Sequence, residues 1–388
     1  MRNPGITLSV LLVIFVASIF YYSYRHTLKT EFPTYFQYSE GAEGSLASLN
    51  SKQSMTKGLL KKWDSIMFDL IKSNKVGDAS ASRIYAYVYT SQRDAAFLSY
   101  NIKHQFMGSF DQVSAGVLCL FFVNDCEKIK LQIKEDVYSE QLATLVLAKV
   151  KERRELDKKQ EHLATELSGS DYWAGVRPYY GQEVGSWMPW AINSTKDFLA
   201  AKPPAPNSPA WQRQLQDTEN ALHHISAKQT KGVVSWAGNP STITPPGIWL
   251  KFSNDYIESE QIPLAQVLFV RSVLAMGMAD AAIAVFYSKY VYWVKRPFML
   301  NPKLHTIMPT PNHPSYPAGH STISAAAAAI LSYYFPQNKQ VWWNKAQEAS
   351  SSRVWGGIHF PIDTEEGLNL GEKIGNAVIQ AQPQSIMS

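Results

Sequence analysis

The segment "HPSYPAGHSTISAAAAAIL", from His313 to Leu331, combines residue types that suit the binding and protonation of an anion. Gly319 allows the backbone to approach a ligand closely, and the alanine-rich run that follows predicts a buried helix. The N–H groups at the start of a helix, together with the positive end of its dipole, form an anion site. His320 is expected to lie beside that anion and to transfer protons there. An ordinary proline-rich loop before a capped helix is the alternative.

Two cations precede this segment in "KYVYWVKRP". Lys289 and Arg296 are seven residues apart, so on one helix they would lie two turns apart on nearly the same face. Pro297 is expected to end that helix. Because two cations on one stripe repel each other, this spacing favours an anion between them. The alternative is a pair of surface cations whose apolar stems cover an aromatic patch.

The segment "SRVWGGIHFPID" adds a third cation and an imidazole–carboxylate pair. Arg353 is the cation, and His359 and Asp363 are four residues apart. If a helix begins near Phe360, the Asp363 carboxylate can accept a hydrogen bond from His359, and Pro361 is compatible with the first helical turn. That bond would fix the tautomer and leave the other ring nitrogen free to attack or to ligate. A plain capping contact is the alternative.

In order, Lys-x6-Arg-Pro, Pro-x-Gly-His and Arg-x5-His-x3-Asp closely resemble the motifs of one superfamily. Its members are type 2 phosphatidic acid phosphatases, bacterial acid phosphatases and vanadium-dependent haloperoxidases, and they are built of helix bundles. The resemblance implies that a tetrahedral phosphate or vanadate lies between two imidazoles, His320 and His359, with Asp363 as the partner of His359. The oxyanion-binding residues that it implies are Lys289, Arg296, Gly319 and Arg353.

The resemblance leaves the reaction open. In a phosphatase, His359 attacks the phosphorus of a phosphate ester and forms a phosphohistidine, while His320 protonates the leaving alcohol, and no cofactor is required. In a haloperoxidase, His359 is the metal ligand that binds vanadate, the substrates are hydrogen peroxide and a halide, and His320 assists proton loss from the peroxide. A non-catalytic oxyanion-binding protein is the third alternative.

The loops favour the bacterial haloperoxidase-like branch of the superfamily. In "PTPNHPSYPAGH", His313 precedes His320 by seven residues, as a histidine does in the haloperoxidase loop. "GGIHFPID" followed by "EGLNLG" is also similar to that branch more than to the lipid phosphatases. The resemblance implies that His313 and Phe286 lie on the halide or substrate side of the site.

Ala318 departs from the family pattern, because most members have serine before the glycine. The missing hydroxyl removes one hydrogen bond to the oxyanion, worth roughly 1 to 3 kcal/mol when the acceptor is charged. Ser321 or Ser315 would have to compensate for it.

The remaining sequence predicts the helices that position these motifs. Apolar residues recur at three- and four-residue spacings before residue 170 and again after residue 263, without persistent strand alternation, so the predicted class is all-α. Proline, glycine and tryptophan between these regions predict long loops that roof a site, broken by a helix near 217–230. We expect a linker at 29–57, an N-terminal helical part at 58–170 and a loop-roofed part with the motifs at 171–388.

Residues 1–28 predict a membrane anchor. The stretch from Ile6 to Tyr24 contains nineteen residues without a charge, which is near the length that crosses a bilayer as a helix. A cleaved signal peptide is the alternative, but no small-x-small cleavage site follows. We expect one N-terminal transmembrane helix, with the soluble part on the periplasmic or other extracytoplasmic side. The positive charges on both flanks do not decide the orientation.

The composition indicates no nucleic-acid partner, and the resemblance implies a small-molecule substrate. The net charge is +5, and no block of lysine or arginine stands out. Cys119 and Cys126 would lie about 10 Å apart along the axis of a continuous helix, too far for a disulfide. We therefore expect two free buried thiols and no metal site at these cysteines.

Overall fold

The structure, a computed structural model, describes residues 53–103, 110–134, 137–158 and 165–382. Within these ranges the regular elements are helices, and β structure is limited to an isolated bridge between Pro240 and Thr242. The prediction of an all-α fold is therefore confirmed. The predicted membrane helix at residues 6–24 and the linker up to residue 52 lie outside the described residues.

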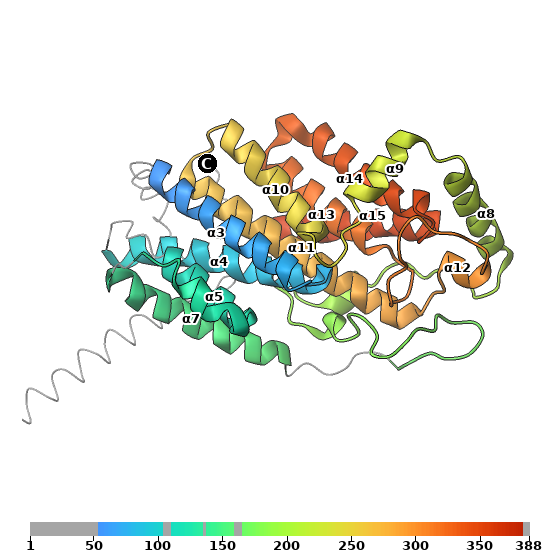
Figure 1. The fold of residues 1–388 in the computed structure, drawn as a ribbon, viewed down its shortest axis with the longest axis horizontal. Coiled ribbons are helices and arrows are strands. Elements are labelled where there is room, and N and C mark those ends of the chain that lie inside the picture. The colour runs from blue at the N-terminus through green and yellow to red at the C-terminus, as the bar shows by residue number, and fades with distance from the viewer. Residues whose placement is uncertain (1–52, 104–109, 135–136, 159–164, 383–388) are drawn as a thin grey trace, which may run out of the picture.

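Four helices from the first half of the chain lie together on one side of the molecule (Figure 1). They are α3 (Gln53–Ser73), α4 (Asp78–Lys103), α5 (Phe110–Phe121) and α7 (Val137–Lys158), with a 3-10 turn (Val123–Asp125) and α6 (Cys126–Lys130) before α7. In α3, buried apolar residues recur every three or four positions at Leu60, Trp63, Met67 and Ile71. This stripe is the face that packs into the core.

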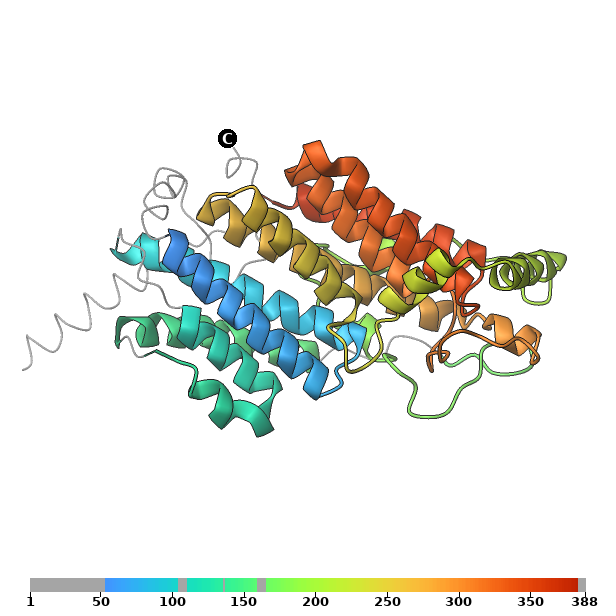
Figure 2. The same ribbon diagram turned by 45° about the horizontal axis from the view of Figure 1, so that its top comes forward.

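The second half of the chain forms the larger body, which lies beside those helices in both views (Figures 1 and 2). Its longer helices are α10 (Thr244–Ser259), α11 (Leu264–Tyr292), α13 (Gly319–Tyr334), α14 (Lys339–Trp355) and α15 (Pro361–Gln380). The shorter ones are α8 (Pro209–His223), α9 (Ala227–Ser235) and α12 (Pro297–Leu300), with 3-10 turns at Val184–Ser186, Thr195–Phe198 and Pro336–Asn338.

Two predictions for the loop region are wrong in detail. The single helix expected near 217–230 is two helices, because Ser226 accepts a hydrogen bond from the Gln229 N–H and caps the start of α9. The helix α10 falls partly in the stretch predicted to be loop. Pro245 and Pro246 suggested a loop, but both lie in its first turn, where proline is tolerated.

Helix α11 is the centre of the fold. It packs against α4 from the first half and against α13 and α15 from the second, so one hydrophobic core runs through both. In the part of the chain that the structure describes, Leu264–Leu300 is the one stretch long and apolar enough to cross a membrane, and its apolar window is 100% buried inside the protein. Burial on all sides is what a hydrophobic core helix shows.

Buried polar contacts fix α11 to its surroundings. Arg271 forms a bidentate ion pair with Asp64 of α3, with N–O distances of 2.6 and 2.8 Å. Asp280 accepts hydrogen bonds from three successive backbone N–H groups of the loop at 190–192. These contacts orient α11 relative to α3 and the roofing loop. The division of the chain at residue 170 into two parts stays a prediction.

The prediction of two free thiols is wrong, because Cys119 and Cys126 form a disulfide. The prediction assumed a continuous helix. In the structure α5 ends at Phe121, and the turn at Val123–Asp125 reverses the chain before α6. The two Cα atoms are therefore 4.6 Å apart instead of the distance along a helix.

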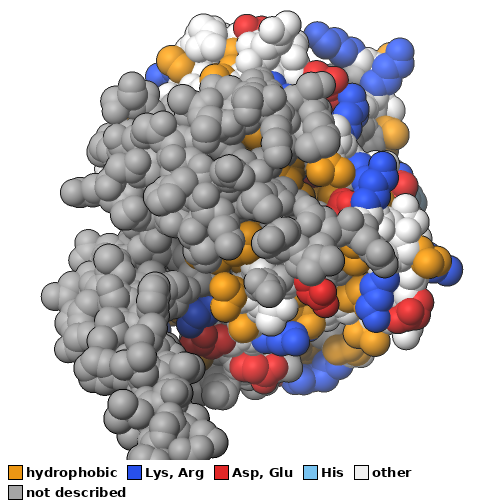
Figure 3. All heavy atoms as spheres, turned by 90° about the vertical axis from the view of Figure 1, so that its left-hand side faces the viewer, with side chains coloured by type: hydrophobic (Ala, Val, Ile, Leu, Met, Phe, Trp, Pro, Cys, Tyr) orange, Lys and Arg blue, Asp and Glu red, His pale blue; other side chains and the backbone are white. Residues whose placement is uncertain are grey.

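The end of the bundle drawn in Figure 3 carries basic, acidic and hydrophobic side chains interspersed on its described part. A basic face of the kind that binds nucleic acid is not present on the described residues of this view. This agrees with the mild net charge of the chain.

The alanine run of α13 and three glycines of α15 allow these two helices to approach closely. A Cβ atom added to Gly371 would lie 2.1 Å from the Thr322 carbonyl oxygen and 2.8 Å from the Ala325 Cβ. Gly367 and Gly375 are similarly close to the backbone of α13. Small residues on both faces thus set the separation of the two helices whose first turns carry two of the predicted motifs.

Replacing Gly371 with alanine should therefore destabilise the protein by about 1 to 3 kcal/mol, the usual range for overpacking. The matched control is Gly58→Ala in α3, where an added Cβ meets nothing within 4 Å. That change should stabilise the helix by about 0.5 to 1 kcal/mol. Urea unfolding followed by circular dichroism measures both, and equal stabilities for the two variants would contradict the packing argument.

Candidate active site

The three predicted motifs meet around a cavity of about 310 Å³. It lies where α13 and α15 begin, beside the C-terminal end of α11 and the N-terminal end of α4. Of the predicted site residues, those that line it are Phe286, Lys289, His313, Gly319, His320, Arg353 and His359. Arg296 and Asp363 lie behind this lining and contact it.

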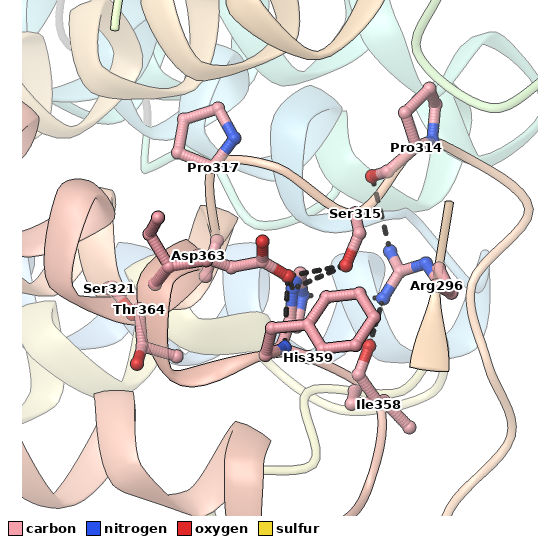
Figure 4. Close-up of polar contacts among 12 residues, drawn as sticks. Arg296, Pro314, Ser315, Pro317, Ser321, Ile358, His359, Asp363 and Thr364 are labelled. Atoms are coloured by element: carbon pink, nitrogen blue, oxygen red, sulfur yellow. Dashed lines mark hydrogen bonds and ion pairs between the residues drawn. The ribbon is translucent and has the colours of Figure 1, made fainter. Parts of the chain in front are cut away.

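His359 and Asp363 form the predicted pair at the start of α15 (Figure 4). The His359 Nδ1 is 3.0 Å from the Asp363 Oδ2, which also accepts hydrogen bonds from the Phe360 N–H at 3.1 Å and the Ser315 hydroxyl at 2.5 Å. Pro361 occupies the first helical position, as predicted. Since the carboxylate accepts the Nδ1 proton, the lone pair of His359 is on Nε2, which the Arg296 Nη1 faces at 3.3 Å.

The titration of this pair is set mainly by burial. Burial, with the Arg296 and Lys289 cations, lowers the pKa of His359 well below its usual value, so the imidazole is neutral. Burial raises the pKa of Asp363 to about 6, against the hydrogen bonds from Ser315 and Phe360, which lower it. At neutral pH the pair is therefore a carboxylate and a neutral imidazole.

Arg296 contacts two of the three histidines that line the cavity, His359 and His313. Its Nη1 is 3.3 Å from the His359 Nε2 and its Nη2 is 3.1 Å from the His313 Nδ1. The same side chain donates to the carbonyl oxygen of His313 and, as Figure 4 shows, to that of Ile358. The His313 Nδ1 also lies 3.1 Å from the Pro314 carbonyl oxygen, which only accepts, whereas the guanidinium group only donates, so the two contacts favour opposite tautomers of the neutral ring. Burial, with the Lys289 and Arg296 cations, lowers the pKa of His313 well below its usual value.

The prediction that Lys289 and Arg296 share one helix face is wrong. Helix α11 ends at Tyr292, where Trp293 adopts a left-handed conformation with φ of 50°. Arg296 is the residue before α12, and Pro297 begins that helix instead of ending α11. The two cations nevertheless converge, because both donate to the loop that contains Pro314.

Lys289 holds the loop in place. Its ammonium group, fully buried, donates to the carbonyl oxygens of Pro314, Ser315 and Pro317 at 2.7 to 2.9 Å. All three of its protons are used in this way. Its positive charge therefore acts on the cavity mainly through space, while its hydrogen bonds shape the backbone that precedes Gly319.

Arg353 approaches the cavity from the end of α14. Its Nη1 lies 3.3 Å from the Met308 sulfur and its Nη2 lies 3.4 Å from the Val233 carbonyl oxygen. Its Nε donates to the Ser352 hydroxyl at 3.0 Å, whereas the contact with Val233 is long and sulfur is a weak acceptor. Arg353 is thus the cation of the site with the most unused hydrogen-bonding capacity.

The three cations give the cavity an excess of buried positive charge. In the part of the chain that the structure describes, none of them forms an ion pair, and each is at most 1% exposed. Burial lowers the pKa of Arg296 to about 10, and burial with the Arg296 cation lowers that of Arg353 to about 9. A buried charge without a partner is costly, and an anion in the cavity would remove that cost.

The first turn of α13 completes the cavity, as predicted. A Cβ added to Gly319 would meet nothing within 4 Å, so the backbone there faces open space. His320 is partly buried, and its Nε2 is 2.9 Å from the Trp236 carbonyl oxygen. Burial and the Arg353 cation lower the pKa of His320 well below its usual value.

Neither serine replaces the hydroxyl that Ala318 lacks. The Ser315 hydroxyl donates to Asp363, and the Ser321 hydroxyl bonds that of Ser350 at 2.8 Å. Neither side chain lines the cavity. Ala318 itself donates its backbone N–H to the Asp363 carbonyl oxygen at 2.8 Å, which ties the start of α13 to that of α15.

The structure adds two wall residues that the sequence did not reveal. The Tyr180 hydroxyl donates to Asp78 Oδ1 at 2.8 Å, and both line the cavity. The rings of Tyr180 and Phe286 contact the His313 ring, with centroid distances of 5.8 and 5.2 Å. Both wall residues belong to segments without a motif, so only the long-range packing of α4 and the roofing loop brings them here.

Comparisons with known proteins find similarity in the part of the chain that contains the three motifs. Residues 269–387 match the family model described as the PAP2 superfamily. An undecaprenyl-diphosphatase of Sulfolobus acidocaldarius is 30% identical over 142 residues, which are 34% of this chain and 66% of that protein. The match therefore spans just under two thirds of that relative.

Solved structures with the same fold match most of the chain. A bacterial vanadium-dependent iodoperoxidase, described as the first of its kind, has a TM-score of 0.68 at 18% identity, covering 84% of this chain and 96% of that one. A holo-type bacterial vanadium-dependent chloroperoxidase has a TM-score of 0.63 at 11% identity, covering 81% and 94%. At these identities the likeness shows a shared fold.

If the buried cations hold an anion, phosphate or orthovanadate should raise the melting temperature of the protein. An anion at about a hundred times its Kd stabilises the fold by about 2.7 kcal/mol. Arg353→Met should remove most of this stabilisation, whereas Arg213→Met, at an exposed position of α8, should retain it. Thermal unfolding is measured with each anion and with chloride at matched ionic strength. An equal response of both variants would contradict the assignment.

Proposed function

Because residues 269–387 belong to the PAP2 superfamily, we propose that this protein is an oxyanion-dependent enzyme of the vanadium haloperoxidase type. Its reaction would be the oxidation of a halide by hydrogen peroxide, with vanadate bound at His359. The observation that carries the proposal is the set of three buried cations that form no ion pair with any described residue, around a cavity lined by His313, His320 and His359.

The residues fit a tetrahedral oxyanion. His359 presents a neutral imidazole lone pair beside Arg296, and Arg353 has hydrogen-bonding capacity left unused. The N-terminal end of α13 faces open space at Gly319. When bound, vanadate supplies the Lewis-acidic centre at which hydrogen peroxide oxidises a halide. His320 would accept a proton from the peroxide. The hydrogen bonds that Lys289 donates fix the backbone conformation of the loop before Gly319.

The wall around His313 favours this reaction over ester hydrolysis. His313 is held between Phe286 and Tyr180, and its neutral imidazole carries one N–H group. A neutral N–H donor between aromatic rings suits a weakly hydrated halide anion. The haloperoxidase fold over more than four fifths of the chain also supports this choice.

Phosphate-ester hydrolysis is the second candidate, and the undecaprenyl-diphosphatase relative supports it. In that reaction the His359 Nε2 forms a bond to phosphorus while the bond from phosphorus to the leaving oxygen breaks. A His320 protonated on both nitrogens gives one proton to that oxygen. Water then attacks the phosphorus and returns a proton to His320 while the bond from phosphorus to His359 breaks, which releases phosphate. The same cations stabilise the charge on the phosphoryl oxygens.

The location is proposed from two features. The apolar stretch at Ile6–Tyr24 would associate the protein with a membrane. The Cys119–Cys126 disulfide supports a place outside the cytoplasm, since disulfides persist in oxidising compartments. The helical part with the cavity would then work on the periplasmic or other extracytoplasmic side.

Activity assays on the purified full-length chain decide between the candidates. Peroxide-dependent bromide or iodide oxidation that requires added orthovanadate supports the haloperoxidase. Hydrolysis of p-nitrophenyl phosphate that orthovanadate inhibits supports the phosphatase. His359→Ala should reduce the activity that is found by at least about a thousandfold, because that residue bonds the central atom in both reactions.

The control is His305→Ala, which changes an exposed loop histidine outside the cavity lining. It should keep full activity. Near-normal turnover in His359→Ala would refute the mechanism. Anion-dependent stabilisation with no turnover in either assay would instead indicate the third alternative, an oxyanion-binding protein.

Replacing Ser315 with alanine should move the acid limb of the kcat/KM profile to higher pH. The Ser315 hydrogen bond lowers the pKa of Asp363, so its loss raises that pKa above about 6. Since the ionised carboxylate holds the His359 Nδ1 proton, activity falls as the pH drops through this pKa. Ser321→Ala, whose hydroxyl bonds Ser350, should leave the profile unchanged. The same profile in both variants would contradict the role of Ser315.

A further inference from the structure

We propose that the segment Trp236–Gly238, between α9 and α10, positions the imidazole of His320 and determines which of its nitrogens carries the proton. The contact that motivates this is the 2.9 Å distance between the His320 Nε2 and the Trp236 carbonyl oxygen. A carbonyl oxygen only accepts hydrogen bonds, so the Nε2 must donate. The neutral ring then carries its lone pair on Nδ1, which is the nitrogen left to exchange protons in the cavity.

The carbonyl oxygen is held firmly. Trp236 follows the last turn of α9, and its N–H donates to the Gly232 carbonyl oxygen at 3.0 Å. Its ring is 3% exposed and packs against Trp249 and Phe252 of α10, with centroid distances of 6.1 and 6.0 Å. Further along, the Tyr85 hydroxyl of α4 donates to the Ile243 carbonyl oxygen at 2.8 Å. The segment is thus fixed at both ends.

Gly238 is the residue that lets this segment pass over His320. Its φ is +65°, a conformation that other residues rarely adopt. A Cβ added there would lie 2.7 Å from the Pro245 Cδ and 3.1 Å from the His320 Nε2. Any larger residue must therefore displace Pro245, the Trp236–Gly238 backbone or the imidazole, and a shift of either of the last two alters the hydrogen bond.

The charged groups around His320 lower its pKa, and the hydrogen bond to Trp236 acts in the opposite direction. Arg353 from α14, Lys289 from α11, and Arg296 and the His313 ring from the loops all face it and oppose its protonation. The wall carboxylate of Asp78 is bonded to Tyr180 and to the Ala79 N–H, and Asp363 is bonded to His359.

The Trp236 carbonyl oxygen is therefore the acceptor that favours a protonated His320, and its hydrogen bond raises the pKa against those cations.

The catalytic consequence rests on the proposed function, but the tautomer does not. On the full-length protein labelled with ¹⁵N-histidine, NMR should show His320 with a protonated Nε2 and an unprotonated Nδ1. The signals are assigned by their loss in His320→Asn. The opposite tautomer, or fast exchange between both, would overturn the proposal whether or not an activity has been found.

Gly238→Ala tests the role in catalysis. It should lower kcat at least tenfold and shift the limb of the pH profile that reports His320 to lower pH, while the stabilisation by orthovanadate stays. Gly169→Ala is the matched control, because Gly169 has a φ of +111° with open space around it. That variant should keep both the rate and the profile, so strain alone is separated from contact with His320.

A double variant completes the test. If Gly238 acts through His320, the variant Gly238→Ala/His320→Ala should be no slower than His320→Ala alone. A further tenfold loss in the double variant would overturn the proposal. Absence of any activity in the native protein would refute the proposed function, and the NMR signals would still decide how His320 is held.

Discussion

The structure of the C-terminal half depends on the burial of three cations, Lys289, Arg296 and Arg353. They lie near the hydrogen-bonded pair of His359 and Asp363. Lys289 and Arg296 direct their protons to backbone carbonyl oxygens between His313 and Pro317 and at Ile358, so they determine the path of the loops that carry the histidines. These bonds satisfy the donors, while Asp363 and Asp78 offset part of the charge through space. The remaining buried charge carries an electrostatic cost that a bound oxyanion would reduce.

Helix packing determines how far apart the charged residues and histidines of the site lie. The N-terminal ends of α13 and α15 carry one half of the site each, and their separation is set by the glycines of α15 against the alanines of α13. The Ala318 N–H also donates to the Asp363 carbonyl oxygen, so the two first turns are joined directly. A chain that had larger residues at these positions would hold the same motifs too far apart to share one anion.

The sequence was informative where the interactions are local. His359, Asp363 and Pro361 lie within one helix start, and their spacing predicted the hydrogen bond that the structure has. Prediction from the sequence failed where the backbone conformation at one or a few residues determines the direction of the chain. The left-handed Trp293 ends α11 before Arg296, and a short turn brings Cys119 to Cys126. Trp293 packs against Trp173, a segment distant in the chain, and the cysteines are joined by a local turn; residue spacing shows neither.

The same reasoning explains why the motifs identify a superfamily and not a reaction. The cations and the two histidines suit any tetrahedral oxyanion, because they respond to charge and to an electrophilic centre. The motifs do not supply the whole cavity wall, because Asp78, Tyr180 and the residues after Trp236 also line it, from helices and loops outside the motifs. The positions of these N-terminal helices and roofing loops follow from the common core around α11.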